Sequence, residues 1–218
     1  MPPRLQIEID SLKKQILSLG AMVEEQVNIA IKALETKDLD IAQGVIKIDR
    51  KVDEIEVEVE EECLKILALH QPVAVDLRFI TAVIKINNDL ERIGDEAVNI
   101  AERVIYLGSR PSLDVSFDYK EMSEITIKML KDSLDALVSL DIDLAYRVRL
   151  EDDEVDELDK GFFDKVKDVI PDNPERVGSL IHLFSISHHL ERIADHATNI
   201  AEEVIYLIEG VIQRHKKQ

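Results

Sequence analysis

The sequence predicts an all-α protein built as two tandem three-helix bundles that are related by an internal repeat. The composition is the first observation, because 45% of the 218 residues are hydrophobic, 33% are charged, and there are only seven Gly and six Pro. Such a balance is typical of helical proteins. The second observation is that residues 88–107 (NDLERIGDEAVNIAERVIYL) return at 188–207 (HHLERIADHATNIAEEVIYL) with six differences in twenty positions. Self-similarity of this kind indicates a chain made of two copies of one supersecondary unit.

Three helices are predicted in the first half, residues 1–108. Apolar residues recur every three or four positions over 5–34, as they do on one face of a long helix. The segment 35–38 interrupts the pattern and supplies Asp38 as a capping residue, so a second helix is expected over 39–69. Pro72 ends that helix and opens a third, which extends to about residue 108.

The second half repeats this order after a linker. Residues 109–118 contain Pro, Ser and Asp with weak periodicity and are expected to join the halves. Helices are then predicted over 119–140, over 141–170 and, after the PDNP sequence, over 174–214, which makes 119–218 the second bundle. The second and fifth helices align at an offset of 103, which places Asp141 opposite Asp38 at the two helix starts.

Charge and cysteine content limit the classes of binding partner and the cellular compartment that we expect for this protein. A formal net charge of −18 repels a phosphodiester backbone, so nucleic acid is not expected as a partner. Cys63 is the single cysteine and cannot form an internal disulfide, and the N-terminus lacks an apolar core of signal-peptide length. We therefore expect a cytoplasmic protein without a membrane span, peripheral to the inner membrane only through its partners.

Both repeats carry acidic side chains at helical spacing on two successive helices. The candidate metal-binding residues of the first repeat are Asp49, Asp53, Glu56, Glu91 and Asp95, and those of the second are Asp152, Asp156, Asp159, Glu191 and Asp195. Successive helices pack antiparallel, so the two stripes of each repeat are expected to face each other. Carboxylates gathered in this way resist ionising together unless a cation compensates their charge. Oxygen ligands favour hard cations such as magnesium, manganese, calcium or ferric iron.

A plainer interpretation of these stripes remains open. Any amphipathic helix of an acidic protein has a solvated acidic face, and a salt-bridge belt that includes Arg92 and Arg192 would use the same residues. Repetition favours the metal site, because the acids are kept in both copies while neighbouring positions, assumed to be on the surface, differ. Those positions are Glu96 against His196 and Arg103 against Glu203.

Histidines offer an optional extension of the second site. His188, His189 and His196 could extend this site, and His188 lies on its acidic stripe, but the first repeat has Asn88, Asp89 and Glu96 at these positions. Histidine is therefore not required at both sites. The sequence contains no phosphate-binding glycine loop, no HExxH motif and no Glu-x-x-His pair of the kind found in di-iron bundles. We therefore expect a protein that is not an enzyme.

The doubled LERIGDEAVNIAE and LERIADHATNIAEEVIY strings, the QPVAVDLR segment and the paired acids of the preceding helices resemble the PhoU family of bacterial phosphate-signalling accessory proteins. The resemblance covers nearly the whole chain and implies two three-helix bundles and a homodimer. It also implies multinuclear iron clusters, with zinc, manganese, magnesium or calcium as alternatives, at [DE]-x-x-x-D motifs. These motifs fall on every candidate residue above except Glu56 and Asp159, which stripe geometry alone adds.

The function that this resemblance implies is regulatory. It implies a negative regulator of the phosphate-starvation response that couples the ATPase subunit of the phosphate ABC transporter to the phosphate sensor histidine kinase. Two alternatives stay open: a metal-free acidic helical adaptor, and a metal-dependent enzyme that uses the carboxylates. The lack of an obvious general base disfavours the enzyme.

Overall fold

The computed structural model describes residues 3–111, 115 and 117–211, which form α-helices and two short 3₁₀ turns without a strand. In chain order these elements are α1 (Pro3–Thr36), α2 (Leu39–His70), α3 (Ala74–Gly108), α4 (Lys120–Ser139), α5 (Ile142–Val169), η1 (Ile170–Asp172), η2 (Pro174–Arg176) and α6 (Val177–Glu209). The all-α prediction is confirmed.

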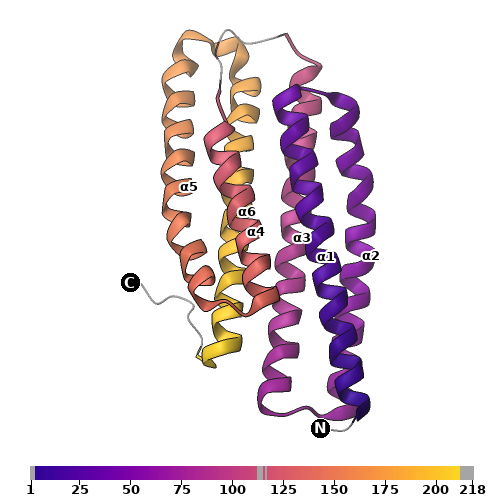
Figure 1. The fold of residues 1–218 in the computed structure, drawn as a ribbon. Helices are drawn as coiled ribbons and strands as arrows, with labels where there is room; N and C mark the ends of the chain where they lie inside the picture. Colours follow the sequence, from indigo (N-terminus) through magenta and orange to yellow (C-terminus); the bar gives the residue numbers. More distant parts are fainter. Residues whose placement is uncertain (1–2, 112–114, 116, 212–218) are drawn as a thin grey trace.

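The helices form two three-helix bundles that stand side by side (Figure 1). One bundle contains α1, α2 and α3, and the other contains α4, α5 and α6. The last helices of the two bundles, α3 and α6, run antiparallel and pack against each other at the centre, and α1 also meets α4. We call the α3–α6 contact the seam. It joins the two copies of the repeated segment, which makes it a pseudo-symmetric contact.

The predicted capping residues begin the second helix of each bundle. The side chain of Asp38 accepts hydrogen bonds from the backbone N–H groups of Asp40 and Ile41, at 2.9 and 3.1 Å. Asp141 accepts one from Leu144 at 3.0 Å. Each bond satisfies an N–H group that has no partner within its own helix, which fixes where α2 and α5 start.

Three predicted helix boundaries were wrong. The third helix begins at Ala74, not at Pro72, because Val73 is the extended N-cap residue with φ −129° and ψ 160°. The sixth begins at Val177 because Pro174 opens a separate 3₁₀ turn. It ends at Glu209, where Gly210 adopts the left-handed conformation. The predicted extension to residue 214 falls partly on 212–218, and the predicted linker partly on 112–114 and 116, which lie outside the described residues.

Apolar side chains from both bundles form one continuous core. Fully buried members include Leu12 of α1 and Ile93 of α3 in the first bundle, and Met129 of α4 and Ile193 of α6 in the second. The core therefore crosses the seam, and each bundle covers apolar surface of the other.

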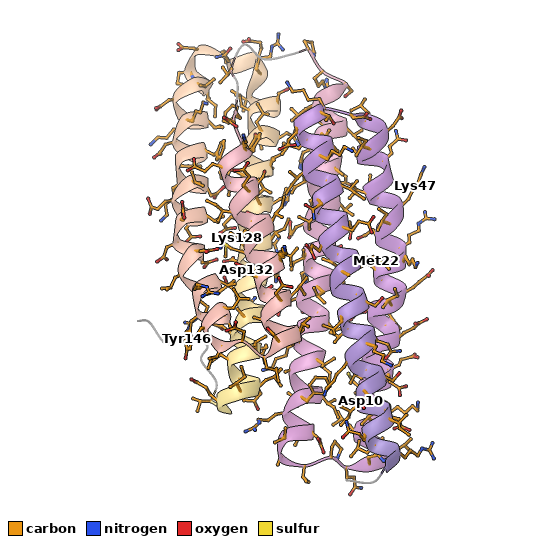
Figure 2. The ribbon with its side chains drawn as sticks, in the orientation of Figure 1. Asp10, Met22, Lys47, Lys128, Asp132 and Tyr146 are labelled. Atoms are coloured by element: carbon orange, nitrogen blue, oxygen red, sulfur yellow. The ribbon has the colours of Figure 1, made fainter. Side chains whose placement is uncertain are left out.

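Charged side chains cover the outside of the helices (Figure 2). On α4, for example, Lys128 Nζ lies 3.1 Å from Asp132 Oδ2, one turn further along the helix. Lys128 also pairs with Glu151 of α5. None of the helices in the described ranges has an apolar stretch long enough to cross a membrane.

Candidate functional site

The first acidic cluster lies where α2 packs against α3, and comprises Asp49, Asp53, Glu56, Glu91 and Asp95. The negative charges of Asp53 and Asp95 repel that of Asp49, and the charges of Asp53 and Glu56 repel that of Glu91. The prediction that the two stripes of this repeat face each other is therefore confirmed.

Burial and repulsion raise the pKa of several carboxyls in this cluster. For Asp49, Glu91 and Asp95, burial is the largest cause. A neighbouring carboxylate adds to it: Asp53 acts on Asp49 and Asp95, and Asp95 acts on Glu91. The pKa of Glu56 is also raised, by burial and then by Glu60. The cluster therefore holds its negative charges at a cost in free energy.

Two amides that the sequence analysis missed hold the first cluster in place. Gln26 of α1 donates from Nε2 to Asp49 Oδ1 at 3.0 Å, and Asn87 of α3 donates from Nδ2 to Glu56 Oε1 at 3.2 Å. Both amides are buried. A polar residue within an apolar stripe was the signal that could have revealed them, because a buried amide requires a partner.

The second acidic cluster occupies the equivalent place between α5 and α6, and comprises Asp152, Asp156, Asp159, Glu191 and Asp195. Burial followed by the charge of Asp195 raises the pKa of Asp152 to about 6 and that of Glu191 to about 7. Asp195 as a whole residue is exposed. Its carboxyl group is nevertheless partly desolvated by the surrounding helices, and this desolvation, followed by the charge of Asp156, raises its pKa. Burial therefore raises the pKa of two carboxyls of this cluster well above their ordinary range.

Hydroxyl groups take the place of the amides in the second cluster. Ser187, the repeat equivalent of Asn87, donates to Asp159 Oδ1 at 2.7 Å. Thr198 donates to Asp152 Oδ1 at 3.1 Å. His188 lies at the rim, with Nδ1 3.3 Å from Glu191 Oε2 and 3.8 Å from Asp159 Oδ2. It is the one histidine of the three weighed that the structure places at a cluster.

The residues present fit a hard cation. Each cluster supplies carboxylate oxygens only, apart from the optional His188, and Glu191 Oε2 is buried without a hydrogen bond among the described residues. A cation would relieve the repulsion that raises these pKa values. Within the described ranges, however, no three His, Cys, Asp or Glu side chains are close enough together to hold one ion. Binding would therefore require carboxylate side chains to rotate inward.

The assumption that Glu96, His196 and Glu203 drift on the surface was wrong. Glu96 is 2% exposed and Glu203 is 3% exposed, and both lie in the seam. Across the seam, His189 Nδ1 is 2.7 Å from Glu96 Oε2, and His196 Nδ1 is 2.9 Å from Asp89 Oδ1. The differences between the repeats therefore create two crossed His–carboxylate pairs that join the bundles.

Other polar residues close to the acidic stripes along α3 and α6 have partners outside the clusters. Asn199 donates across the seam to Asp89 Oδ1 at 3.2 Å, and Asn99 donates to Glu96 Oε2 at 3.3 Å. Glu202 lies 3.5 Å from Arg149 Nε. Asn199 and Asn99 therefore bond within the seam, and Glu202 belongs to a mostly buried ion pair between α5 and α6.

Comparison with known proteins agrees with the internal repeat. The PhoU domain model matches this chain twice, at residues 16–104 and 119–204. The chain is 40% identical over 209 residues to the phosphate-specific transport system accessory protein PhoU homolog of Aquifex aeolicus, covering 96% of this chain and 95% of that protein. The Clostridium acetobutylicum homolog is 37% identical over 204 residues, covering 93% of each.

Two solved structures share the whole fold. The crystal structure of PhoU from Pseudomonas aeruginosa superposes with a TM-score of 0.91 at 37% identity, covering 94% of this chain and 99% of that one. The phosphate transport system regulatory protein PhoU from Streptococcus pneumoniae gives 0.86 at 28% identity, covering 95% and 98%. The sequence matches and the shared architecture both show that this chain belongs to the PhoU family.

Proposed function

We propose that this chain is a regulator of phosphate uptake and of the phosphate-starvation response. In this role it is an adaptor that couples the ATPase subunit of the phosphate transporter to the phosphate sensor kinase, and restrains the kinase when phosphate is plentiful. It acts on the cytoplasmic side of the membrane as a homodimer. The names of its relatives, which describe accessory and regulatory proteins of phosphate transport and no catalytic activity, support this role.

The adaptor uses the two acidic clusters as metal sites. The observation that carries this part of the proposal is that both repeats have five carboxyl side chains at the same helix contact, where burial and repulsion raise the pKa of some of them: Asp49 and Glu91 in the first cluster, and Asp152 and Glu191 in the second. Iron held as a multinuclear cluster is the proposed metal, with zinc, manganese, magnesium or calcium as alternatives. The bound cations would neutralise part of the −18 charge and pull the two helices of each contact together.

A metal-free adaptor is the second candidate. The observation that favours it is that no three ligand side chains among the described residues lie around a common point. In this version the acids serve solubility and attract a basic partner surface.

Elemental analysis of the untagged protein distinguishes the two candidates. The test variant changes Glu91, Asp95, Glu191 and Asp195 to Ala. A matched control changes four exposed acids of α2 and α5 to Ala, namely Glu58, Glu61, Asp153 and Glu154, and so removes the same charge. The metal proposal predicts on the order of two or more metal equivalents per chain in the parent and the control, and a loss in the test variant. A folded, metal-free parent would leave only the acidic adaptor.

The regulatory role needs a separate test in cells. Deleting the coding sequence should switch on phosphate-starvation genes in phosphate-rich medium, and the parent sequence should silence them again. If the cluster variant is folded and fails to silence them while the control variant succeeds, the metal sites carry the regulation. Normal silencing in the deleted strain would contradict the regulatory role itself.

A further inference from the structure

One end of the seam gathers cationic side chains on an otherwise acidic protein. It lies where α3 ends beside the start of α6 (Figure 1). The rings of Tyr106 and His182 contact each other there, with centroids 3.8 Å apart and planes tilted by 33°, and Arg110 Cζ lies 5.0 Å from the Tyr106 centroid. The charges of Arg103 and Arg110 both act on His182. We call these four residues the seam notch.

The opposite end of the seam provides an internal comparison. There, Lys85 Nζ of α3 lies 2.9 Å from Glu203 Oε1 of α6, and the same Nζ lies 5.3 Å from the centroid of Tyr206. The repeat places Arg103 at the position equivalent to Glu203, and Ser185 at the position equivalent to Lys85. The seam notch therefore has the guanidinium group of Arg103 at the position where the opposite end has the carboxylate of Glu203.

Two side-chain nitrogens of the notch lack a hydrogen-bond partner among the described residues: Arg103 Nε–H is a donor, and His182 Nδ1 is a donor in the tautomer that carries its proton there. Both nitrogens are buried. Arg103 Nη1 lies 3.5 Å from Glu102 Oε2, but Glu102 is half exposed and this contact leaves Nε unused. A buried donor without an acceptor costs free energy, so a ligand that supplies acceptors is stabilised here.

The charge around these donors indicates which ligand they suit. Burial first, and then Arg103 and Arg110, lower the pKa of His182, so the imidazole is neutral near pH 7 and the charge of the notch comes from the two guanidinium groups. A guanidinium presents a planar fork of N–H donors that matches the oxygens of a phosphate group. Arg110 is exposed, which leaves one side of the notch open to solvent.

We propose that the seam notch binds the phosphate group, as the free ion or as the end of a phosphate ester, through Arg103, Arg110 and His182. Because the notch contains residues from α3 and from α6, the bound anion bridges the two bundles. The site is separate from the acidic clusters, which lie at the α2–α3 and α5–α6 contacts, and it goes beyond the proposed adaptor role. Its failure would leave that role untouched.

Calorimetric titration with inorganic phosphate and, separately, with AMP tests the site on the protein as purified. We expect one saturable site per chain, weakened about tenfold or more by Arg103→Gln or Arg110→Gln, because each loses charge-assisted hydrogen bonds. Arg147→Gln, an exposed position on α5, is the matched control and should bind as the parent does. Phosphate binding without AMP binding assigns the free ion, whereas tighter binding of AMP assigns an ester.

A second variant distinguishes loss of ligand binding from loss of folding. Arg103→Glu combined with Ser185→Lys installs the ion pair of the opposite end, and should fold while binding neither ligand. In the parent, the ring signals of His182 in NMR spectra should shift on titration with phosphate. Absence of saturable binding to both ligands at millimolar concentration would overturn the proposal. Binding that Arg103→Gln and Arg147→Gln weaken equally would overturn it as well.

Discussion

At the scale of single residues, the acidic clusters keep carboxyl groups in places that oppose their ionisation. Glu191 is the clearest example, because burial and four neighbouring aspartates raise its pKa to about 7, with Asp195 the largest of the four. The hydroxyl groups of Ser187 and Thr198 donate hydrogen bonds to Asp159 and Asp152, and these two bonds offset only part of the repulsion between the carboxylates. The sequence predicted which acids meet, since helical spacing fixes the face of each one. A polar residue in an apolar stripe indicates that Gln26 needs a partner, but the sequence could not predict which acid Gln26 or Ser187 contacts, because that depends on how separate helices pack.

The raised pKa of Glu191 predicts a pH-dependent stability of the metal-free protein. Between about pH 4.5, the ordinary value for this group, and about pH 7, folded Glu191 holds a proton that the unfolded chain has released. The free energy of unfolding therefore decreases as the pH rises through this window. Glu191→Gln removes the effect, and should make the chelated protein about 1–2 kcal/mol more stable at pH 8 while changing little at pH 4.

Urea unfolding at both pH values measures this difference. Glu154→Gln is the control, because Glu154 is an exposed acid on α5 outside the cluster. It should change the free energy of unfolding by less than about 0.5 kcal/mol at either pH. A Glu191→Gln protein that is less stable than the parent at pH 8 would mean that Glu191 is held by favourable contacts.

At the scale of helices, α3 carries acids on two sides, and the sequence distinguished their roles only in part. Glu91 and Asp95 face α2, as predicted, whereas Asp89 and Glu96 face α6. Comparison of the two repeats did not reveal the side of α3 that faces α6. Residues that pair across a pseudo-symmetric seam must be complementary, so they differ between the copies, and Glu96 against His196 therefore resembled surface drift.

Gly94 allows α3 to approach α2 closely enough to form the first cluster. A Cβ atom at this position would lie 3.1 Å from Gln26 Oε1 and 3.4 Å from Asp49 Oδ1. Gly94→Leu should therefore reduce the free energy of unfolding by about 1–3 kcal/mol through overpacking. Gly44→Leu on α2 is the control, since a Cβ atom there meets nothing within 4 Å.

Urea denaturation of both glycine variants checks this expectation. The control should be neutral or slightly stabilising, because leucine favours a helix by about 0.8 kcal/mol over glycine. Equal stabilisation by both substitutions would show that α2 and α3 are not in close contact at Gly94. Metal content measured on the same samples would report whether the cluster needs this approach.

At the scale of the whole molecule, the two bundles are joined more strongly than a tandem repeat requires. The core crosses the seam, and the seam buries Glu96 against His189 and Arg192 from the other bundle. This charge pairing lowers the pKa of Glu96, although burial alone would raise it. The sequence predicted two bundles correctly but not how they meet, because a helix with several polar edges does not indicate which edge is buried.

Glu96→Ala tests whether the bundles unfold together. The substitution leaves His189 and Arg192, whose side chains are 12% and 41% exposed, without their shared carboxylate, so it should cost about 1–3 kcal/mol. Because one core spans both bundles, urea unfolding followed by circular dichroism should remain a single transition with a lower midpoint. Glu61→Ala, an exposed acid on α2, is the control and should leave the midpoint nearly unchanged. Two separate transitions in the parent would instead show that the bundles are independent, and that the seam pairs act only in docking one bundle on the other.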